Sequence, residues 1–197
     1  MRELPSVRTL SAEGADSAEP LPRAGSAALN LPSIRLRPLT LRDAHALLAG
    51  TGRPALGLAW HCDYPMTDTV GAVDMLMAAH RAAGWQGSTV PAWWLHQIVL
   101  DGVVVGDVGF HGPAGDGMTA EVEIGYSVVA PLRGRGVATR ACGLIVERAW
   151  RDGAAVVSAE TDADNVASQQ VLLRSGFRAT GHFRYVLERP TLVRAAS

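Results

Sequence analysis

Hydrophobic and polar positions in the first half of the chain predict a strand followed by two helices. Residues 1–32 carry no sustained apolar period and are rich in Ser, Ala, Glu, Pro and Gly, which is typical of a disordered or loosely docked arm. The run "SIRLRPL" that follows has the apolar positions of a strand. Thr40 and Asp43 then form the pattern of a capping box at the start of a helix. Residues 67–84 place apolar side chains at helical spacing, which predicts a second helix.

The second half of the chain alternates between strand-like and helix-like patterns. Two β-rich runs, "WWLHQIVL" and "VVVGDVGF", are joined by Asp101-Gly102, a dipeptide that favours a type I′ hairpin turn. A third strand, "TAEVEIGYSVV", precedes a helix that begins at about Gly136. The short apolar run "AAVVSAET", the helix "NVASQQVLLRS" and a last strand, "FRATGHFRYVLE", complete the pattern.

The order of these elements defines the fold class. It is β-α-α-β-β-β-α-β-α-β, an antiparallel meander followed by a βαβ crossover whose strands are expected to be parallel. We therefore predict an α/β (α+β) fold with a mixed, mostly antiparallel sheet and helices on both faces. One domain would span residues 33–190, after the arm at 1–32 and before a C-terminal tail at 191–197.

Composition argues against several classes of function. All 18 basic residues are arginine, which excludes a Walker-type P-loop and Schiff-base chemistry on lysine. The net charge of -1 argues against nucleic acid and membrane partners, and neither a long apolar run nor a signal-peptide layout is found. The two cysteines, Cys62 and Cys142, lack the spacing of a zinc site or a disulfide framework, so a reducing cytoplasm is the expected location.

The turn Arg133-Gly134-Arg135-Gly136 lies between a predicted strand and a predicted helix. The first turn of a helix presents unpaired N–H groups and the positive end of the helix dipole, which suits a phosphate. Glycines let the backbone approach an anion closely, and arginines add charged donors. From this turn alone, an anion cradle and a solvated surface turn remain equally good interpretations.

A second motif, Asn165-x-x-Ser168, begins the following helix. Asn165 is a suitable N-cap, and Ser168 lies one turn later on the same face. Taken alone, this is an ordinary cap with a surface serine. At the carboxyl end of a strand parallel to the previous one, however, both side chains would face the same crevice as the arginine-glycine turn.

Together, "EIGYSVVAPLRGRGVATRA" and "NVASQQVLLRSGF" resemble the GNAT superfamily of acyl-CoA-dependent N-acyltransferases. The family signature Arg/Gln-x-x-Gly-x-Gly/Ala is matched by Arg133, Gly136 and Ala138. The resemblance covers about residues 34–186. Within the family, the sequence is similar to the branch that includes ribosomal-protein N-terminal acetyltransferases and many bacterial small-molecule acetyltransferases. It implies that the central parallel pair of strands is splayed.

The resemblance implies acetyl-CoA as the donor and no metal. The backbone amides of the arginine-glycine turn and the hydroxyl of Thr139 would bind its pyrophosphate. Pantetheine would pair with the preceding strand. A backbone amide near the end of that strand would polarise the thioester carbonyl. The implied contacts of acetyl-CoA are Val128, Val129, Arg133, Gly134, Arg135, Gly136, Val137, Ala138, Thr139, Asn165 and Ser168.

Two acidic residues and one serine are the candidates for catalysis. Glu123, on the strand beside the thioester site, is the candidate general base, acting through water, and Glu160 is the reserve candidate. Glu121 shares a strand face with Glu123, so that each raises the pKa of the other, unless either forms a salt bridge with an arginine. Many family members carry a tyrosine where this chain has Leu172, so the role beside the thiolate is assigned to Ser168.

The acceptor pocket is expected in the least patterned segments, which include "WHCDYP" and "GFHGP", and on the second predicted helix. Asp63 would hold a cationic amine. The candidate walls are Trp60, Tyr64, Trp94 and His111. Each of these residues is also explained by ordinary packing, and the spacing of His61-Cys62-Asp63 does not indicate a metal site.

These features favour an enzyme that moves an acetyl group from acetyl-CoA to a primary amine of a small molecule or metabolite. An acetyltransferase of protein N-termini is the first alternative. A non-catalytic acyl-CoA-binding regulatory domain is the second, and the presence of Glu123, Asn165 and Ser168 argues against it. The family is often dimeric, so a homodimer stays open.

Overall fold

The structure is a computed structural model that describes residues 33–50, 58–82, 84, 94–111 and 121–190. The predicted arm at 1–32 and the predicted tail at 191–197 lie outside the described residues. In chain order the elements are β1 (Ile34–Pro38), α1 (Leu41–Leu48), β2 (Ala59–Trp60), α2 (Thr67–Ala82), β3 (Leu95–Leu100), β4 (Val103–Phe110), β5 (Glu121–Val128), a 3-10 turn (Ala130–Leu132), α3 (Val137–Arg151), β6 (Val156–Glu160), α4 (Val166–Arg174), β7 (Arg178–Gly181) and β8 (Arg184–Glu188).

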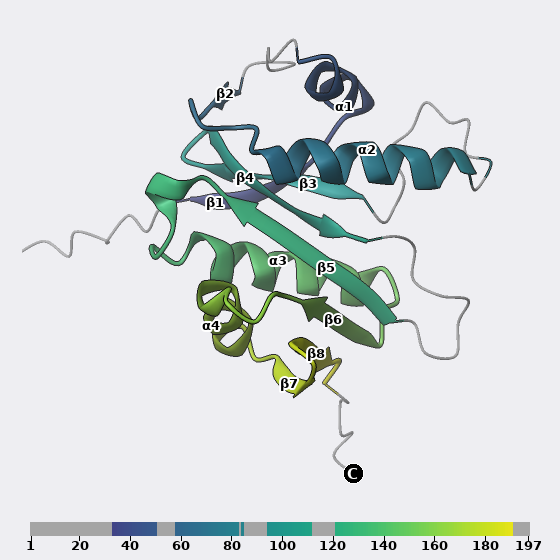
Figure 1. Ribbon diagram of the computed structural model, residues 1–197, viewed down its shortest axis with the longest axis vertical. Coiled ribbons are helices and arrows are strands. Elements are labelled where there is room, and N and C mark those ends of the chain that lie inside the picture. Colours follow the sequence, from purple (N-terminus) through teal and green to yellow (C-terminus); the bar gives the residue numbers. More distant parts are fainter. Residues whose placement is uncertain (1–32, 51–57, 83, 85–93, 112–120, 191–197) are drawn as a thin grey trace, which may run out of the picture. The chain divides into compact units, whose positions relative to one another are not determined.

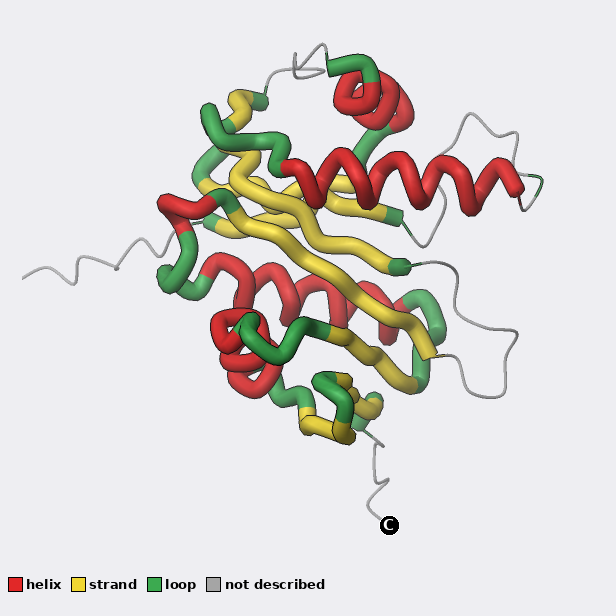
Figure 2. Tube along the Cα trace, viewed as in Figure 1, coloured by secondary structure: helices red, strands yellow, loops and turns green. Residues whose placement is uncertain are grey.

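The strands form a mixed sheet with the order β1-β3-β4-β5-β6-β8-β7, and β2 pairs with β4. Among the described strands, the pairs β5–β6 and β2–β4 are parallel and the others are antiparallel. Helices α1 and α2 contact each other on one side of the sheet, and α3 and α4 contact each other on the other side (Figure 1, Figure 2). The predicted mixed sheet with helices on both faces is therefore confirmed.

The apolar side of α3 explains why this helix lies on the sheet. Val137, Ala141 and Ile145 recur at helical spacing, and all three are buried. They belong to one core cluster with Phe110 of β4 and Ile124 of β5. Burying a side chain of this size contributes about 1.5–3 kcal/mol. This packing fixes β5 and α3 relative to each other, and with them the turn that joins the two elements.

Local signals in the sequence account for two further features. Asp101 and Gly102 have φ values of 46° and 86°, as a type I′ turn requires, and the predicted β3–β4 hairpin is confirmed. Thr40 Oγ1 accepts the N–H of Asp43, and Asp43 Oδ2 accepts the N–H of Thr40, so the predicted capping box is confirmed as well.

The predictions differ from the structure at two places. The last predicted strand is in fact a hairpin, β7–β8, because His182 and Phe183 both adopt positive φ values (49° and 57°) and reverse the chain. No Asn-Gly or Asp-Gly dipeptide marked this turn. The segment before α2, where no strand was predicted, contains β2, whose two residues pair with Val103 and Val104 and are too few to show a period.

Candidate active site

The parallel strands β5 and β6 diverge from each other along their length. They pair at Glu121↔Val156, Val122↔Val157 and Glu123↔Ser158, and this is the extent of their register. Beyond it, a cleft of about 350 Å³ opens between β5, the end of β6 and α4. Its lining comprises Ile124, Gly125, Tyr126, Ala159, Glu160, Thr161, Asp162, Asn165, Ser168, Leu172 and His182.

The backbone of β5 directs alternate residues towards this cleft. The N–H of His111 donates to Glu123 O, and the N–H of Val129 donates to Val105 O, so the odd-numbered residues of β5 bond to β4. In a ladder the intervening residues turn their N–H and C=O groups to the opposite side, which places those of Tyr126 and Val128 towards the cleft. Of the backbone amides near the end of β5, that of Val129 is not available to polarise a thioester, because its N–H already has an acceptor.

The turn between β5 and α3 presents a row of backbone donors. Gly134 and Gly136 have φ values of 71° and 79°, a region that favours glycine. The first backbone bond of the helix runs from the N–H of Arg140 to Gly136 O, and α3 has no side-chain cap. From Gly134 to Thr139, therefore, the N–H groups have no acceptor in the described part of the chain.

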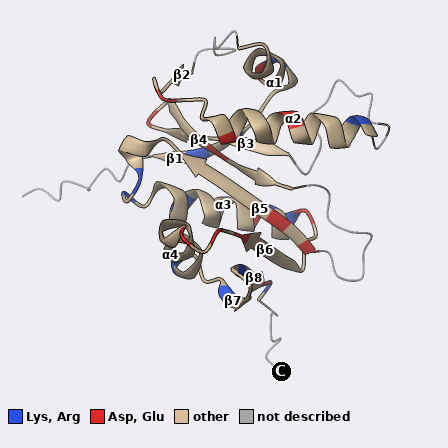
Figure 3. Cartoon of the chain, in the orientation of Figure 1, with Lys and Arg blue, Asp and Glu red and all other residues tan. Residues whose placement is uncertain are grey.

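The arginines of this turn play different parts. Arg133 Nε donates to Val128 O over 2.9 Å, which ties the turn to the end of β5. Arg135 is exposed in the turn, as Arg133 is, and Arg140 is exposed on α3. Figure 3 shows basic residues at the turn before α3. The resulting cradle is positively charged and rich in backbone donors, so it suits a pyrophosphate.

Asn165 and Ser168 both line the cleft, as the sequence predicted. Asn165 Oδ1 accepts the N–H of Ser168 over 3.1 Å and so caps α4. The hydroxyl of Ser168 lies 2.8 Å from the hydroxyl of Tyr126, which also donates to the backbone oxygen of Ser168 over 3.1 Å. Burial raises the pKa of Tyr126 to about 12, so this phenol stays protonated at ordinary pH.

Sequence reasoning missed Tyr126, although a signal for it existed. Strand periodicity puts Tyr126 on the same side of β5 as Ile124, which is buried against α3. A tyrosine on that side, beside a predicted Asn-x-x-Ser helix, needs a partner for its hydroxyl.

Glu123 has a histidine as its partner. The carboxylate Oε1 lies 2.9 Å from Nδ1 of His111, and both side chains are about 40% exposed (39% and 41%). Among the described residues, no arginine forms an ion pair with Glu123. The salt bridge to an arginine, the alternative interpretation of this residue, is therefore not found within the described residues.

Glu121 does form such a salt bridge. Its carboxylate accepts a hydrogen bond from Arg184, and the Ser158 hydroxyl and this arginine lower its pKa. The expectation that Glu123 raises the pKa of Glu121 is wrong, because these partners stabilise the charged form. Arg184 also lies 4.0 Å from Glu160, the reserve candidate, which lines the cleft.

A second cavity, of about 200 Å³, lies on the other side of β5, under α2. Cross-strand pairing places Asp107 opposite Ser127 and Gly109 opposite Gly125, on the face towards α2. The space that a side chain would take at these two glycines is filled by Leu95 and His111, which both line the cavity. The lining comprises Asp68, Ala72, Met75, Leu76, Leu95, Asp107, Gly109, Phe110, His111, Gly125, Tyr126 and Ser127. Gly125 and Tyr126 line both cavities, so β5 separates them.

Asp107 is the most buried ionisable group of this second cavity. It is 4% exposed, and its Oδ2 accepts a hydrogen bond from the Thr69 hydroxyl. Burial raises its pKa to about 7, with a smaller contribution of the same sign from Asp68. No arginine or histidine of the described residues forms an ion pair with it. A buried carboxylate without a cation is costly, and the cavity is open to a cationic ligand.

Of the residues proposed for the acceptor pocket, only His111 lines this cavity. Trp94 is fully buried (0% exposed) and donates from its indole to Leu39 O over 2.8 Å. Tyr64 is also buried, beside Gln97 and Trp60 in the core. As wall residues of this cavity, Tyr64 and Trp94 are therefore wrong predictions, because large aromatic side chains gain more by burial in the core. Trp60 is partly buried, packs against the core and does not line the cavity.

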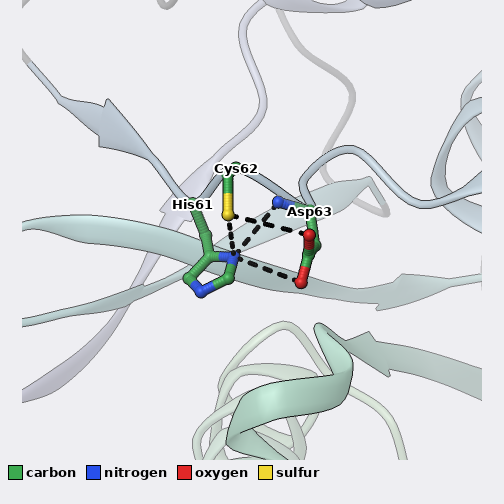
Figure 4. Close-up of side chains that lie close together, drawn as sticks. All are labelled: His61, Cys62 and Asp63. Atoms are coloured by element: carbon green, nitrogen blue, oxygen red, sulfur yellow. Dashed lines mark hydrogen bonds and ion pairs between the residues drawn. The ribbon is translucent and has the colours of Figure 1, made fainter.

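Asp63, predicted to hold an amine, lies instead in a small surface cluster. Its backbone N–H donates to Nδ1 of His61 over 3.1 Å, and Cys62 Sγ lies 3.7 Å from both neighbouring side chains (Figure 4). The possible ligand atoms of the three residues all lie within 4.8 Å of one another, which their spacing did not suggest. Because Nδ1 already accepts the Asp63 N–H, the cluster is explained as a turn stabilised by side chains.

Comparisons with known proteins bear on this arrangement. The acetyltransferase (GNAT) domain family matches residues 33–178. Similar solved structures include Mycobacterium smegmatis RimJ in complex with CoA-disulfide, with 22% identity, a TM-score of 0.56 and coverage of 82% of this chain and 85% of that one. The aminoglycoside acetyltransferase AAC(6')-Ib in complex with coenzyme A has 16% identity, a TM-score of 0.53 and coverage of 80% and 95%.

A third similar structure is RimL, a ribosomal L7/L12 α-N-protein acetyltransferase in complex with coenzyme A, with 17% identity, a TM-score of 0.54 and coverage of 79% and 94%. At these identities the structures show a shared fold. A search of curated protein sequences finds no match. Within the described residues, no helix has both the length and the apolar character needed to cross a membrane.

Proposed function

Since the chain belongs to the acetyltransferase (GNAT) domain family, and is thus an acetyl-CoA-dependent N-acetyltransferase, we propose that its acceptor is a primary amine of a small molecule. The acetyl group passes directly from the thioester to the amine, without an acetylated enzyme. The observation that carries the proposal is the position of β5, with a cleft suited to the donor on one side and a small cavity with a buried carboxylate on the other.

The donor fits the first cleft. The N–H groups from Gly134 to Thr139 would bind the pyrophosphate, with Arg135 close by and Arg133 holding the turn in place. Pantetheine would then pair with β5 where Tyr126 and Val128 turn their backbone groups towards the cleft. The binding site would thus run from the turn before α3 along Val128 and Tyr126 into the cleft between β5 and β6.

The chain contributes to the transfer of the acetyl group in three ways. Aminolysis of a thioester needs a neutral amine, a stabilised oxyanion and a leaving thiolate of tolerable basicity. Glu123 supplies the negative charge that favours removal of a proton from the amine. A backbone N–H of β5 on the cleft side polarises the thioester carbonyl. When Tyr126 turns its proton from the backbone oxygen to Oγ of Ser168, the Ser168 hydroxyl is left to donate a hydrogen bond to the departing sulfur.

The second cavity supports a small acceptor. Asp107 and Asp68 would bind a cationic group of the acceptor, since neither has an arginine partner among the described residues and both line the cavity. The cavity volume of about 200 Å³ is large enough for a small amine with few non-hydrogen atoms. We place the reacting nitrogen near Gly125, where the two cavities share a wall.

Acetylation of a protein N-terminus remains the second candidate, because RimJ and RimL are among the similar structures. The test uses the purified full chain, acetyl-CoA and two acceptor panels: small amines with a second cationic group, and short peptides with free N-termini. Mass spectrometry identifies the product. We expect acetylated small amines. Acetylation of peptides alone supports the second candidate, and binding of CoA without transfer to either panel supports a regulatory domain.

A further inference from the structure

We infer that His111 is the residue that takes the proton from the acceptor amine, and that Glu123 is a positioning residue that acts through it. This inference rests on the proposed function and assigns the proton acceptor within it. His111 lines the cavity proposed for the acceptor, whereas Glu123 lines neither that cavity nor the donor cleft. The histidine therefore lies between the carboxylate and the acceptor.

The hydrogen bond between the two residues sets the tautomer of the imidazole. A carboxylate only accepts hydrogen bonds, so the contact of 2.9 Å from Nδ1 to Glu123 Oε1 requires the proton on Nδ1. In the neutral ring, Nε2 then carries the lone pair and is free to accept a proton. When it does so, the negative charge of Glu123 stabilises the imidazolium.

The absence of a side chain at Gly125 leaves room for the imidazole of His111. A Cβ atom at this position would stand 2.6 Å from Nε2 of His111, a separation that real Cβ atoms essentially never show, and 3.1 Å from Cε1, so the ring would have to shift. The missing side chain lets the ring lie over β5 with Nε2 directly above the strand. Because Gly125 lines both cavities, Nε2 lies where the amine and the thioester would meet.

Acidic side chains from three elements lie around the imidazole. Glu123 contacts it from β5, while Asp107 on β4 and Asp68 on α2 line the same cavity. Arg184 bonds to Glu121 and lies beside Glu160, next to the donor cleft. No arginine lines the acceptor cavity among the described residues, so no cation opposes proton uptake by His111.

The step balances without any further reactant. The amine nitrogen attacks the thioester carbonyl carbon, a C–N bond forms, and the nitrogen passes its proton to Nε2. The tetrahedral intermediate collapses, the C–S bond breaks, and the thiolate takes up a proton to leave as CoA. The imidazolium then returns its proton to solvent. The products are the acetylated amine and free CoA.

The test compares kcat/KM for the amine as a function of pH in the wild type, His111→Gln, Glu123→Gln and a control, His45→Gln, which alters an exposed histidine of α1. A general base contributes on the order of 100-fold or more, so we expect a loss of about that size in His111→Gln. The acid side of the wild-type pH profile should be absent from this variant. The affinity for CoA, measured by calorimetry, should stay the same.

Glu123→Gln keeps an oxygen that accepts the Nδ1 proton but removes the charge. We therefore expect a smaller loss than in His111→Gln, with the acid limb of the profile moved to lower pH, because the imidazolium loses its counter-charge. Gly125→Ala should lower the rate as His111→Gln does, since it displaces the ring.

Several outcomes would overturn the inference. An unchanged pH profile and rate in His111→Gln, with a large loss in Glu123→Gln, would make Glu123 the base and leave the proposed function intact. A wild type that binds CoA but acetylates no amine would overturn both. Circular dichroism and thermal unfolding of each variant show whether a lost rate reflects a lost fold, and the shift of the acid limb in Glu123→Gln then decides the matter.

Discussion

The hydroxyl groups of Tyr126 and Ser168 lie 2.8 Å apart, across the gap between β5 and α4. Tyr126 also donates to the backbone oxygen of Ser168, so the phenol fixes both the main chain and the side chain at the start of α4. This helix carries a leucine, Leu172, where many family members have a catalytic tyrosine. In this chain a tyrosine hydroxyl reaches the same cleft from β5.

We predict that Tyr126→Phe and Ser168→Ala act on the same step. Each substitution removes one member of a hydrogen-bonded pair, so kcat should fall by about 10-fold in either variant, as expected for about 1.4 kcal/mol. The double variant should be little worse than the single ones. Steady-state kinetics of the four proteins measure this coupling. Strictly additive losses would show that the two hydroxyls act independently.

Gly136→Val should weaken the binding of CoA by about 10-fold or more. Its φ of 79° is strained for any residue with a Cβ, by about 1–2 kcal/mol, although no atom would clash with the new side chain. The strain disturbs the backbone donors at the start of α3. Arg140→Ala, at an exposed position one turn later, is the matched control and should leave the affinity unchanged. Equal effects in calorimetry would contradict the backbone cradle.

Asp107 should make the stability of the protein fall with rising pH. Its pKa is raised to about 7 in the folded state from an ordinary value of 3.8, so the folded state binds this proton more tightly than the unfolded state. The stabilisation is complete below the ordinary pKa and is lost as the pH rises through about 7.

Asp107→Asn removes this dependence. Asparagine cannot ionise, yet its side-chain oxygen can still accept the hydrogen bond from Thr69. The variant should be more stable than the wild type at about pH 8, and the difference should shrink towards about pH 5. Thermal unfolding at several pH values measures this. A constant difference across the range would mean that Asp107 does not titrate in the folded protein.

The same substitution should impair acceptor binding. If Asp107 holds a cationic group of the acceptor, Asp107→Asn should raise KM for a diamine by about 10-fold or more, with a smaller effect on kcat. An amine of the same size without the second cationic group should respond less. An unchanged KM for both amines would remove Asp107 from the acceptor site.

Features that depend on neighbouring residues could be predicted from the sequence. The Asp101-Gly102 turn, the Thr40–Asp43 box and the Asn165 cap each arise from chemistry within four residues, and all three are present. The glycines of the turn before α3 belong to this group, because a positive φ is a property of the residue itself. The order of elements followed from the same local signals.

Features that depend on strand register could not be predicted. Asp107 belongs to the second cavity because β4 and β5 pair at Asp107↔Ser127, and a single sequence does not give this register. The partner of Glu123 was missed for the same reason, since His111 lies opposite it across the β4–β5 pair. Trp94 was misplaced because the strand-like run that contains it does not show that the indole is buried in the core.

The most direct test of the central claim is the initial rate of acetyl transfer with both substrates varied. The donor cleft and the acceptor cavity lie on either side of β5 and share Gly125, so both substrates must be bound together for direct transfer. We expect double-reciprocal plots that intersect, with acetylated small amine and free CoA formed in equal amounts. Parallel lines, together with an acetylated form of the protein isolated in the absence of amine, would contradict the account.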